Sequence, residues 1–263
     1  MSRIDQTFSD LRAAGRSGLV AYVTAGDPDL TRSREIVLAI DRAGADVIEV
    51  GVPFSDPIAD GPAIQRASER ALAAGGHLST TLDLVADVRG RVKAPIVLFT
   101  YVNPVLHMGV DAFVARAASA GVDGVLLLDL PIEESETMRQ QLDRRGLDQI
   151  FLVSPTTTDP RLHEAARLGR GFLYAISRTG VTGARAAVAG SARPLVERIR
   201  GMTSLPVALG FGISRPEHVQ EVCSFVDAAV VGSALVQVIA EASSSGADPA
   251  IRAGEFVGWL KGR

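Results

Sequence analysis

One acidic residue, Glu49, stands inside the apolar run Val47–Gly51. Side chains alternate between the two faces of a β-strand, so Ile48 and Val50 would share one face and Val47 and Glu49 the other. If the apolar pair packs against helices, Glu49 points into the interior, where burial raises the pKa of a carboxyl group. Such a group can act as a general acid and base near neutral pH. A structural glutamate held in a buried ion pair is an equally open alternative.

Further carboxylates lie in the segment that follows, residues 52–62, which holds Asp56 and Asp60 among three prolines. Proline fixes its own backbone angle, so this segment can hold a carboxylate in one place. Asp60 is the better candidate for chemistry, because Gly61 and Pro62 turn the chain directly into the next helix. Aspartate also caps turns and helix N-termini, and for Asp56 we prefer that structural interpretation.

Two glycine-rich turns late in the chain, Gly210–Ser214 and Gly232–Ala234, each lead into a helical pattern. Glycine lets backbone N–H groups approach an anion, and helix N-termini favour negative charge. The two turns therefore indicate a phosphate site, with ordinary glycine turns as the alternative.

The segment Ser177–Ser191 is long for a connection between a strand and a helix, and it is rich in small residues. This composition suits a lid that excludes water, in which Gly183 could supply one more phosphate-binding N–H group. A flexible insertion without a role is the alternative. Tyr22 and Tyr174, inside expected strands, could reach into the same site as hydroxyl donors or serve only in packing.

Short apolar runs alternate with segments of helical periodicity along the whole chain. This alternation predicts a parallel sheet, and eight repeats in 263 residues favour a closed (β/α)8 TIM barrel. Phosphate sites in this fold often use the loops after strands seven and eight, where the two glycine-rich turns lie. We expect one domain, residues 1–263, with an extra helix before the first strand and another after the second. The expected strands are Leu19–Val23, Val47–Gly51, Ile96–Thr100, Gly124–Leu128, Gln149–Val153, Gly171–Ile176, Pro206–Leu209 and Ala228–Val231.

Composition excludes several classes of function. The net charge is -3 and no basic stripe is present, which argues against a nucleic-acid partner. Cys223 is the only cysteine and the four histidines are scattered, so neither a disulfide nor a metal site is expected. The first residues are polar and no apolar run approaches the ~20 residues of a membrane helix, so we expect a cytoplasmic protein with no membrane contact.

Several of these segments together resemble the signature of the tryptophan synthase alpha subunit. The most specific match runs from Glu49 to Pro62. The resemblance covers nearly the whole chain in order, and its further segments are Val23–Pro28, Asp129–Pro131, Ser177–Gly183, Gly210–Ser214 and Gly232–Ala234.

The resemblance implies a lyase of tryptophan biosynthesis that cleaves indole-3-glycerol phosphate to indole and glyceraldehyde 3-phosphate, without a cofactor or metal. It assigns proton transfer to Glu49, and to Asp60 it assigns stabilisation of the positive charge that develops on the indole ring. The other matching positions are Tyr22, Thr100, Tyr174 and Thr182 for the substrate, and Gly183, Gly212, Gly232 and Ser233 for its phosphate.

Members of the family pair with a β subunit, a pyridoxal phosphate enzyme, in an αββα heterotetramer. The loop after strand two and the segment Tyr101–Pro104 lie near that interface in the family. Two alternatives remain open at this point, a stand-alone lyase that releases indole and a weakly catalytic activator of a β subunit. A different sugar-phosphate barrel is disfavoured by the run Pro53–Pro57.

Overall fold

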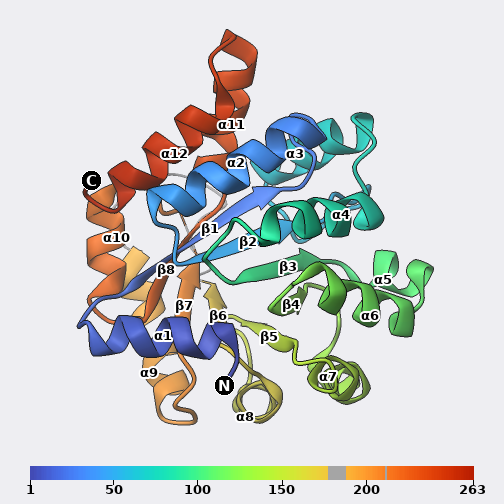
Figure 1. Cartoon of the computed structure of the whole chain (residues 1–263). Coiled ribbons are helices and arrows are strands. Elements are labelled where there is room, and N and C mark those ends of the chain that lie inside the picture. Colours follow the sequence, from blue (N-terminus) through green and yellow to red (C-terminus); the bar gives the residue numbers. More distant parts are fainter. Residues whose placement is uncertain (177–187, 211) are drawn as a thin grey trace.

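The computed structural model describes residues 1–176, 188–210 and 212–263, and its eight parallel strands close into a barrel (Figure 1). Strand order follows the sequence, and β1 pairs with β8 to complete the ring. The predicted fold class is confirmed, and the predicted strand bounds agree within two residues. The strands are β1 (Gly18–Thr24), β2 (Val47–Gly51), β3 (Ile96–Thr100), β4 (Gly124–Leu127), β5 (Asp148–Val153), β6 (Leu173–Ile176), β7 (Val207–Gly210) and β8 (Ala228–Val231).

Helices surround the strands as an outer layer (Figure 1). The two extra helices expected from the sequence are present, since α1 precedes β1 and both α3 and α4 separate β2 from β3. None of the described helices is long and apolar enough to cross a membrane. The helices are α1 (Arg3–Ala13), α2 (Leu30–Ala43), α3 (Pro62–Ala73), α4 (Leu78–Arg89), α5 (Val102–Met108), α6 (Val110–Ala120), the 3₁₀ turn η1 (Ile132–Glu134), α7 (Ser135–Asp143), α8 (Asp159–Leu168), α9 (Val188–Arg200), α10 (Pro216–Cys223), α11 (Ser233–Ser245) and α12 (Pro249–Leu260).

Alternation along the strands divides the core into two layers. On β2, Ile48 and Val50 pack toward the helices, whereas Val47 belongs to the cluster inside the barrel. Glu49 therefore shares the inner face with Val47, as the alternation in the sequence predicts. The inner cluster takes one or two residues from every strand and includes Val20, Tyr22, Val47, Val97, Phe99, Leu126, Ile150, Phe172, Ala208, Ala228 and Val230.

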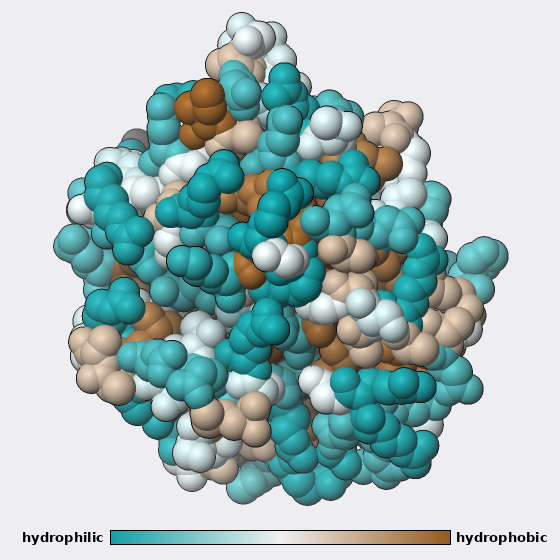
Figure 2. Space-filling model, viewed as in Figure 1, coloured by the Kyte–Doolittle hydropathy of each residue, from teal (hydrophilic) through white to brown (hydrophobic). Residues whose placement is uncertain are grey.

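Helix α1 closes the end of the barrel at which the strands begin. Its residues Ile4, Phe8 and Leu11 are buried in the inner cluster, and the Phe8 ring lies 5.6 Å from that of Phe172. Figure 1 shows this helix lying across that end. The face shown in Figure 2, viewed from the same side, is mostly hydrophilic with small separate apolar patches. Among the described residues, α1 thus covers the end of the inner cluster at which the strands begin.

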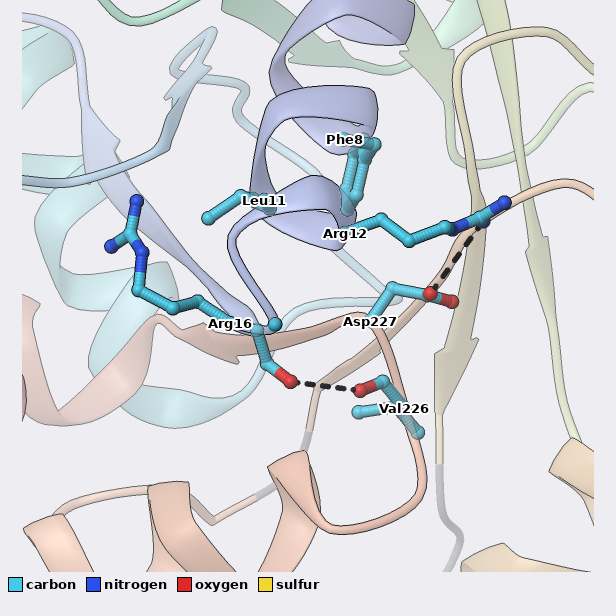
Figure 3. Close-up of a pocket in the computed structure, with 8 residues that line it drawn as sticks. Phe8, Leu11, Arg12, Arg16, Val226 and Asp227 are labelled. Atoms are coloured by element: carbon cyan, nitrogen blue, oxygen red, sulfur yellow. Dashed lines mark hydrogen bonds and ion pairs between the residues drawn. The ribbon is translucent and has the colours of Figure 1, made fainter.

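A surface hollow of about 200 Å³ lies beside α1, at the turn that leads into β8 (Figure 3). Its polar groups pair with one another, since Arg12 lies 3.9 Å from the Asp227 carboxylate and the Ser17 hydroxyl donates to the Val226 carbonyl at 3.3 Å. The hollow is at the end of the barrel opposite to Glu49. Active sites of this fold lie at the carboxyl ends of the strands, so we look for the site there.

One buried ion pair fixes α3 to the loop after β1. The Arg70 guanidinium donates to both carboxylate oxygens of Asp27 at 2.7 and 2.8 Å. Only 3% of the Asp27 side chain is exposed, and its burial raises the pKa of the carboxyl group while Arg70 opposes that rise. Because Asp60 precedes α3 by two residues, this pair also fixes the segment that carries Asp60.

Replacement of Arg70 by methionine should destabilise the fold by about 3 kcal/mol, because it leaves a buried carboxylate without its cation. Chemical denaturation at pH 7 measures this loss. The double variant Asp27→Asn/Arg70→Met, which removes both charges, should recover part of the stability. A single variant as stable as the wild type would show that the pair contributes nothing.

Candidate active site

Glu49 is fully buried on the inner face of β2. Neither of its carboxyl oxygens has a hydrogen-bond partner in the part of the chain that the structure describes. Burial raises the pKa of Glu49 to about 8, so the group is mostly protonated at neutral pH. The described residues thus provide no ion pair for Glu49. The side chain is a neutral acid that holds a transferable proton.

Asp60 lies in the loop between β2 and α3 and is partly buried. Its carboxylate accepts a hydrogen bond from the Tyr101 hydroxyl at 3.0 Å, and that hydroxyl accepts one from the Ala59 N–H at 3.0 Å. Burial raises the pKa of Asp60 to about 6, and the bond from Tyr101 opposes the rise. Asp60 is therefore mostly ionised at neutral pH, in contrast to Glu49.

Two tyrosines on the inner face lie close to both acids. Burial, together with the charges of Glu49 and Asp60, raises the pKa of the Tyr22 and Tyr174 hydroxyls. Tyr22 is next to Glu49 in the β1–β2 pairing, and its ring packs edge-on against Phe99 at 5.2 Å. The two acids and the two tyrosines therefore lie together toward the carboxyl ends of the strands.

Each tyrosine hydroxyl requires a glycine on the neighbouring strand. A β-carbon on Gly51 would lie 2.1 Å from the Tyr22 hydroxyl oxygen, and one on Gly210 would lie 2.3 Å from that of Tyr174. Contacts this short are impossible, so any larger residue would push the ring out of place. Gly51 and Gly210 therefore determine where the two rings lie.

Gly51→Ala should displace Tyr22, reduce stability by about 2 kcal/mol through overpacking, and impair any reaction in the barrel. Thermal unfolding and a ligand-binding assay measure the two effects. Gly90→Ala is the matched control, since Gly90 has helical backbone angles and no atom within 4 Å of an added β-carbon. Equal behaviour of the two variants would contradict the steric explanation.

The phosphate-binding candidates that the structure describes lie at the starts of two helices. Gly232 and Ser233 begin α11, whose N-terminus has no side-chain cap and no acidic residue in its first turn. A β-carbon on Gly232 would lie 3.7 Å from the Cβ of Tyr22, so this turn lies beside Tyr22. Gly212 precedes α10 with φ +58, in the left-handed region that favours glycine. Free N–H groups at a helix N-terminus suit an anion.

Comparison with known proteins identifies the family. A family model described as tryptophan synthase alpha chain matches residues 8–261. The tryptophan synthase alpha chain of Geotalea uraniireducens is 50% identical over 261 residues, which cover 99% of this chain and 97% of that one. The chain belongs to the tryptophan synthase alpha chain family.

Solved structures agree with this assignment. The tryptophan synthase alpha subunit of Legionella pneumophila superposes with a TM-score of 0.91 at 36% identity, covering 100% of this chain and 98% of that one. A Pyrococcus furiosus chain, from a structure of the tryptophan synthase a2b2 complex, gives a TM-score of 0.87 at 39% identity over 94% of this chain and 98% of that one. The resemblance predicted from the sequence is confirmed. The tryptophan synthase alpha chain is a lyase of tryptophan biosynthesis that cleaves indole-3-glycerol phosphate.

The structure brings most of the predicted site residues together, but it places Thr100 differently from the prediction. Thr100 was expected to line the substrate pocket, yet it follows Phe99 on β3 and so shares the outward face of Leu98. The inward residue is Phe99, which belongs to the inner cluster and contacts Tyr22. On β3 it is therefore Phe99, and not Thr100, that faces the barrel interior beside Tyr22.

Two further predicted residues, Thr182 and Gly183, lie outside the described residues. The sequence interpretation also missed Tyr101 as a partner of Asp60, although a polar aromatic residue directly after a strand is a usable sign of a site residue. Among the described residues, no three or more histidine, cysteine, aspartate or glutamate side chains gather as a metal-binding group.

Proposed function

We propose that Glu49 and Asp60 carry out the cleavage of indole-3-glycerol phosphate in this chain, with no metal or cofactor. The observation that supports the proposal is the contrast between the two acids, which both lie near Tyr22 and Tyr174. Burial raises the pKa of Glu49 to about 8 and that of Asp60 to about 6. Between these values one group is a proton donor and the other an anion, which is the division of labour that this reaction requires.

Glu49 transfers its proton to the indole ring carbon that carries the glycerol chain. The ring becomes positively charged, mainly at its nitrogen, and the ionised Asp60 accepts a hydrogen bond from that N–H. The carbon–carbon bond then breaks and its electron pair returns to the ring, forming indole. The adjacent glycerol hydroxyl gives its proton to the Glu49 carboxylate as the aldehyde forms, so Glu49 ends the cycle protonated, as it began.

The remaining residues bind and orient the substrate. Tyr22 and Phe99 offer aromatic surface to the indole ring, and Tyr174 lies beside Glu49. The start of α11, with Gly232 and Ser233, supports binding of the phosphate at a helix N-terminus, to which Gly212 would contribute from the neighbouring turn. For Thr182 and Gly183 we propose contacts from the lid, on the family resemblance alone.

The test is turnover of indole-3-glycerol phosphate by the purified chain, with indole and glyceraldehyde 3-phosphate measured together. We expect equal amounts of the two products. Indole glycerol without the phosphate should react at least about a hundredfold more slowly, because binding of the phosphate contributes to reaching the transition state. No turnover even in the presence of a β subunit would contradict the proposal.

We further propose that the chain docks on a tryptophan synthase β subunit, as in the a2b2 complex of the Pyrococcus furiosus relative. Two large exposed apolar side chains support this, since Ile58 is 87% exposed and Leu106 is 60% exposed. Ile58 lies in the Asp60 loop and Leu106 on α5, and the Tyr101–Asp60 hydrogen bond joins these two segments. Ile58→Asp and Leu106→Asp should weaken the complex in analytical ultracentrifugation.

As an enzyme of amino-acid biosynthesis, the chain would act in the cytoplasm.

The two alternatives give different results in the same assays. A stand-alone lyase would release indole equally fast with and without a β subunit. A mere activator would still stimulate the β subunit, and its indole release would not change in the Glu49→Gln variant.

A further inference from the structure

Asp129 belongs to the segment Asp129–Pro131, which matches the family signature but has no part in the reaction described above. It lies two residues past the end of β4, on the carboxyl side of the barrel. Its Oδ1 accepts a hydrogen bond from the Val102 N–H at 2.7 Å. Val102 is the first residue of α5, so this bond joins the loop after β4 to the start of the helix after β3.

The residue next to Val102 is Tyr101, and its side chain reaches the Asp60 loop. Tyr101 is 2% exposed, and its ring packs against Phe54 at 4.9 Å. Its hydroxyl donates to Asp60 Oδ2 and accepts from the Ala59 N–H, both at 3.0 Å. Two hydrogen bonds therefore link Asp129 to Asp60. Asp129 accepts one from the Val102 backbone N–H, and the hydroxyl of the preceding residue, Tyr101, donates the other to the Asp60 carboxylate.

We propose that Asp129 is a positioning residue for Asp60, acting through the backbone of Val102 and the hydroxyl of Tyr101. This inference rests on the proposed role of Asp60. When Asp129 is lost, the start of α5 is free to move and the Tyr101 hydroxyl no longer meets Asp60 in a fixed geometry. Asp60 then loses its donor but keeps its burial.

The other groups around Asp60 leave its charge state sensitive to this one bond. Tyr101 faces it from the start of α5, Tyr22 from β1 and Tyr174 from β6, and Glu49 on β2 lies near the last two of these tyrosines. The hydroxyls have raised pKa values and Glu49 is mostly protonated at neutral pH, so none of these groups is a cation. A hydrogen bond to the ionised form lowers a carboxyl pKa, so loss of the Tyr101 bond should raise the pKa of Asp60 further above about 6.

The experiment compares Asp129→Ala, Asp129→Asn, Tyr101→Phe and the double variant Asp129→Ala/Tyr101→Phe in the presence of the β subunit. The acid limb of kcat/KM should move up by about 1 pH unit in Asp129→Ala, so that activity at pH 6 falls about fivefold more than at pH 8. Tyr101→Phe should move the acid limb by the same amount, and the double variant should move it no further. Asparagine keeps the acceptor oxygen, so Asp129→Asn should retain the wild-type profile.

A second readout does not depend on activity. Titration of the Asp60 carboxyl carbon by ¹³C NMR, assigned through Asp60→Asn, should show the same displacement in Asp129→Ala. An equal loss of activity at every pH with an unchanged titration would overturn the inference, as would Asp129→Asn behaving like Asp129→Ala or additive effects in the double variant. If the wild type released no indole, the proposed function would fail, while the NMR titration would still decide the role of Asp129.

Discussion

Glu49→Gln should reduce the rate of indole formation by about a thousandfold, within the 10²–10⁴-fold range of general acid–base catalysis. Glutamine keeps the shape of the side chain but has no proton to give and cannot accept one. At pH 7 Glu49 is mostly protonated, so glutamine also keeps the neutral charge of the buried site. KM for indole-3-glycerol phosphate should therefore change little while kcat falls. Single-turnover measurements with saturating enzyme separate the effect on the chemical step from the effect on substrate binding.

The matched control is Glu69→Gln, at an exposed glutamate on α3, which should leave kcat unchanged. Stability gives an independent check of the Glu49 pKa. A carboxyl group with a raised pKa in the folded state binds protons more tightly there, so the wild type should lose stability as pH rises from about 4.5 to about 8. The melting temperature of Glu49→Gln should lack this loss. A variant with wild-type kcat would remove Glu49 from the reaction.

The sequence predicts the position of Glu49 well because one local rule determines it. Alternation along a strand separates Val47 and Glu49 from Ile48 and Val50, and the structure places the two pairs on opposite faces. The number and order of the strands follow equally directly, since each apolar run is bounded by turn residues. What the pattern leaves open is whether Glu49 has an ion-pair partner, because a partner can come from any segment of the chain.

The strand Ile96–Thr100 is predicted correctly, but the assignment of Thr100 to the substrate differs from the structure for a related reason. Near the end of a strand an error of one residue reverses the face, and the sequence alone does not determine which of Phe99 and Thr100 points inward. The neighbouring helix α5 is not among the elements expected from the sequence, and its first turn contains Pro104. The bond from Tyr101 to Asp60 joins residues 41 positions apart and depends on the barrel having closed.

Glu49 and Asp60 differ in pKa because their surroundings differ. Glu49 is enclosed by the barrel interior and has no donor among the described residues, so burial acts on it unopposed. Asp60 is partly exposed, so burial raises its pKa less strongly. The hydrogen bond from Tyr101 also opposes the rise. Activity that requires protonated Glu49 and ionised Asp60 should rise with pH near 6 and fall near 8.

Asp60→Asn should lower kcat/KM by about a hundredfold to a thousandfold, the usual effect of removing one group that stabilises charge in a transition state. Asparagine can still accept a hydrogen bond from the indole N–H, but it lacks the negative charge that offsets the developing positive charge on the ring. The acid limb of the pH profile, expected near pH 6, should disappear in this variant while the basic limb near pH 8 remains. Initial rates of indole formation between pH 5 and pH 9 measure both features.

Asp56→Asn separates this effect from a general change in the loop. Asp56 lies in the same segment, is exposed, and accepts a hydrogen bond from the Ser55 hydroxyl at 2.6 Å. In the isolated chain its replacement should leave both limbs in place, because the Asp56 side chain is exposed and its hydrogen bond with Ser55 stays within the loop. If Asp60→Asn kept the acid limb, another group would be responsible for it. The stabilising charge would then have to be sought elsewhere around the indole ring.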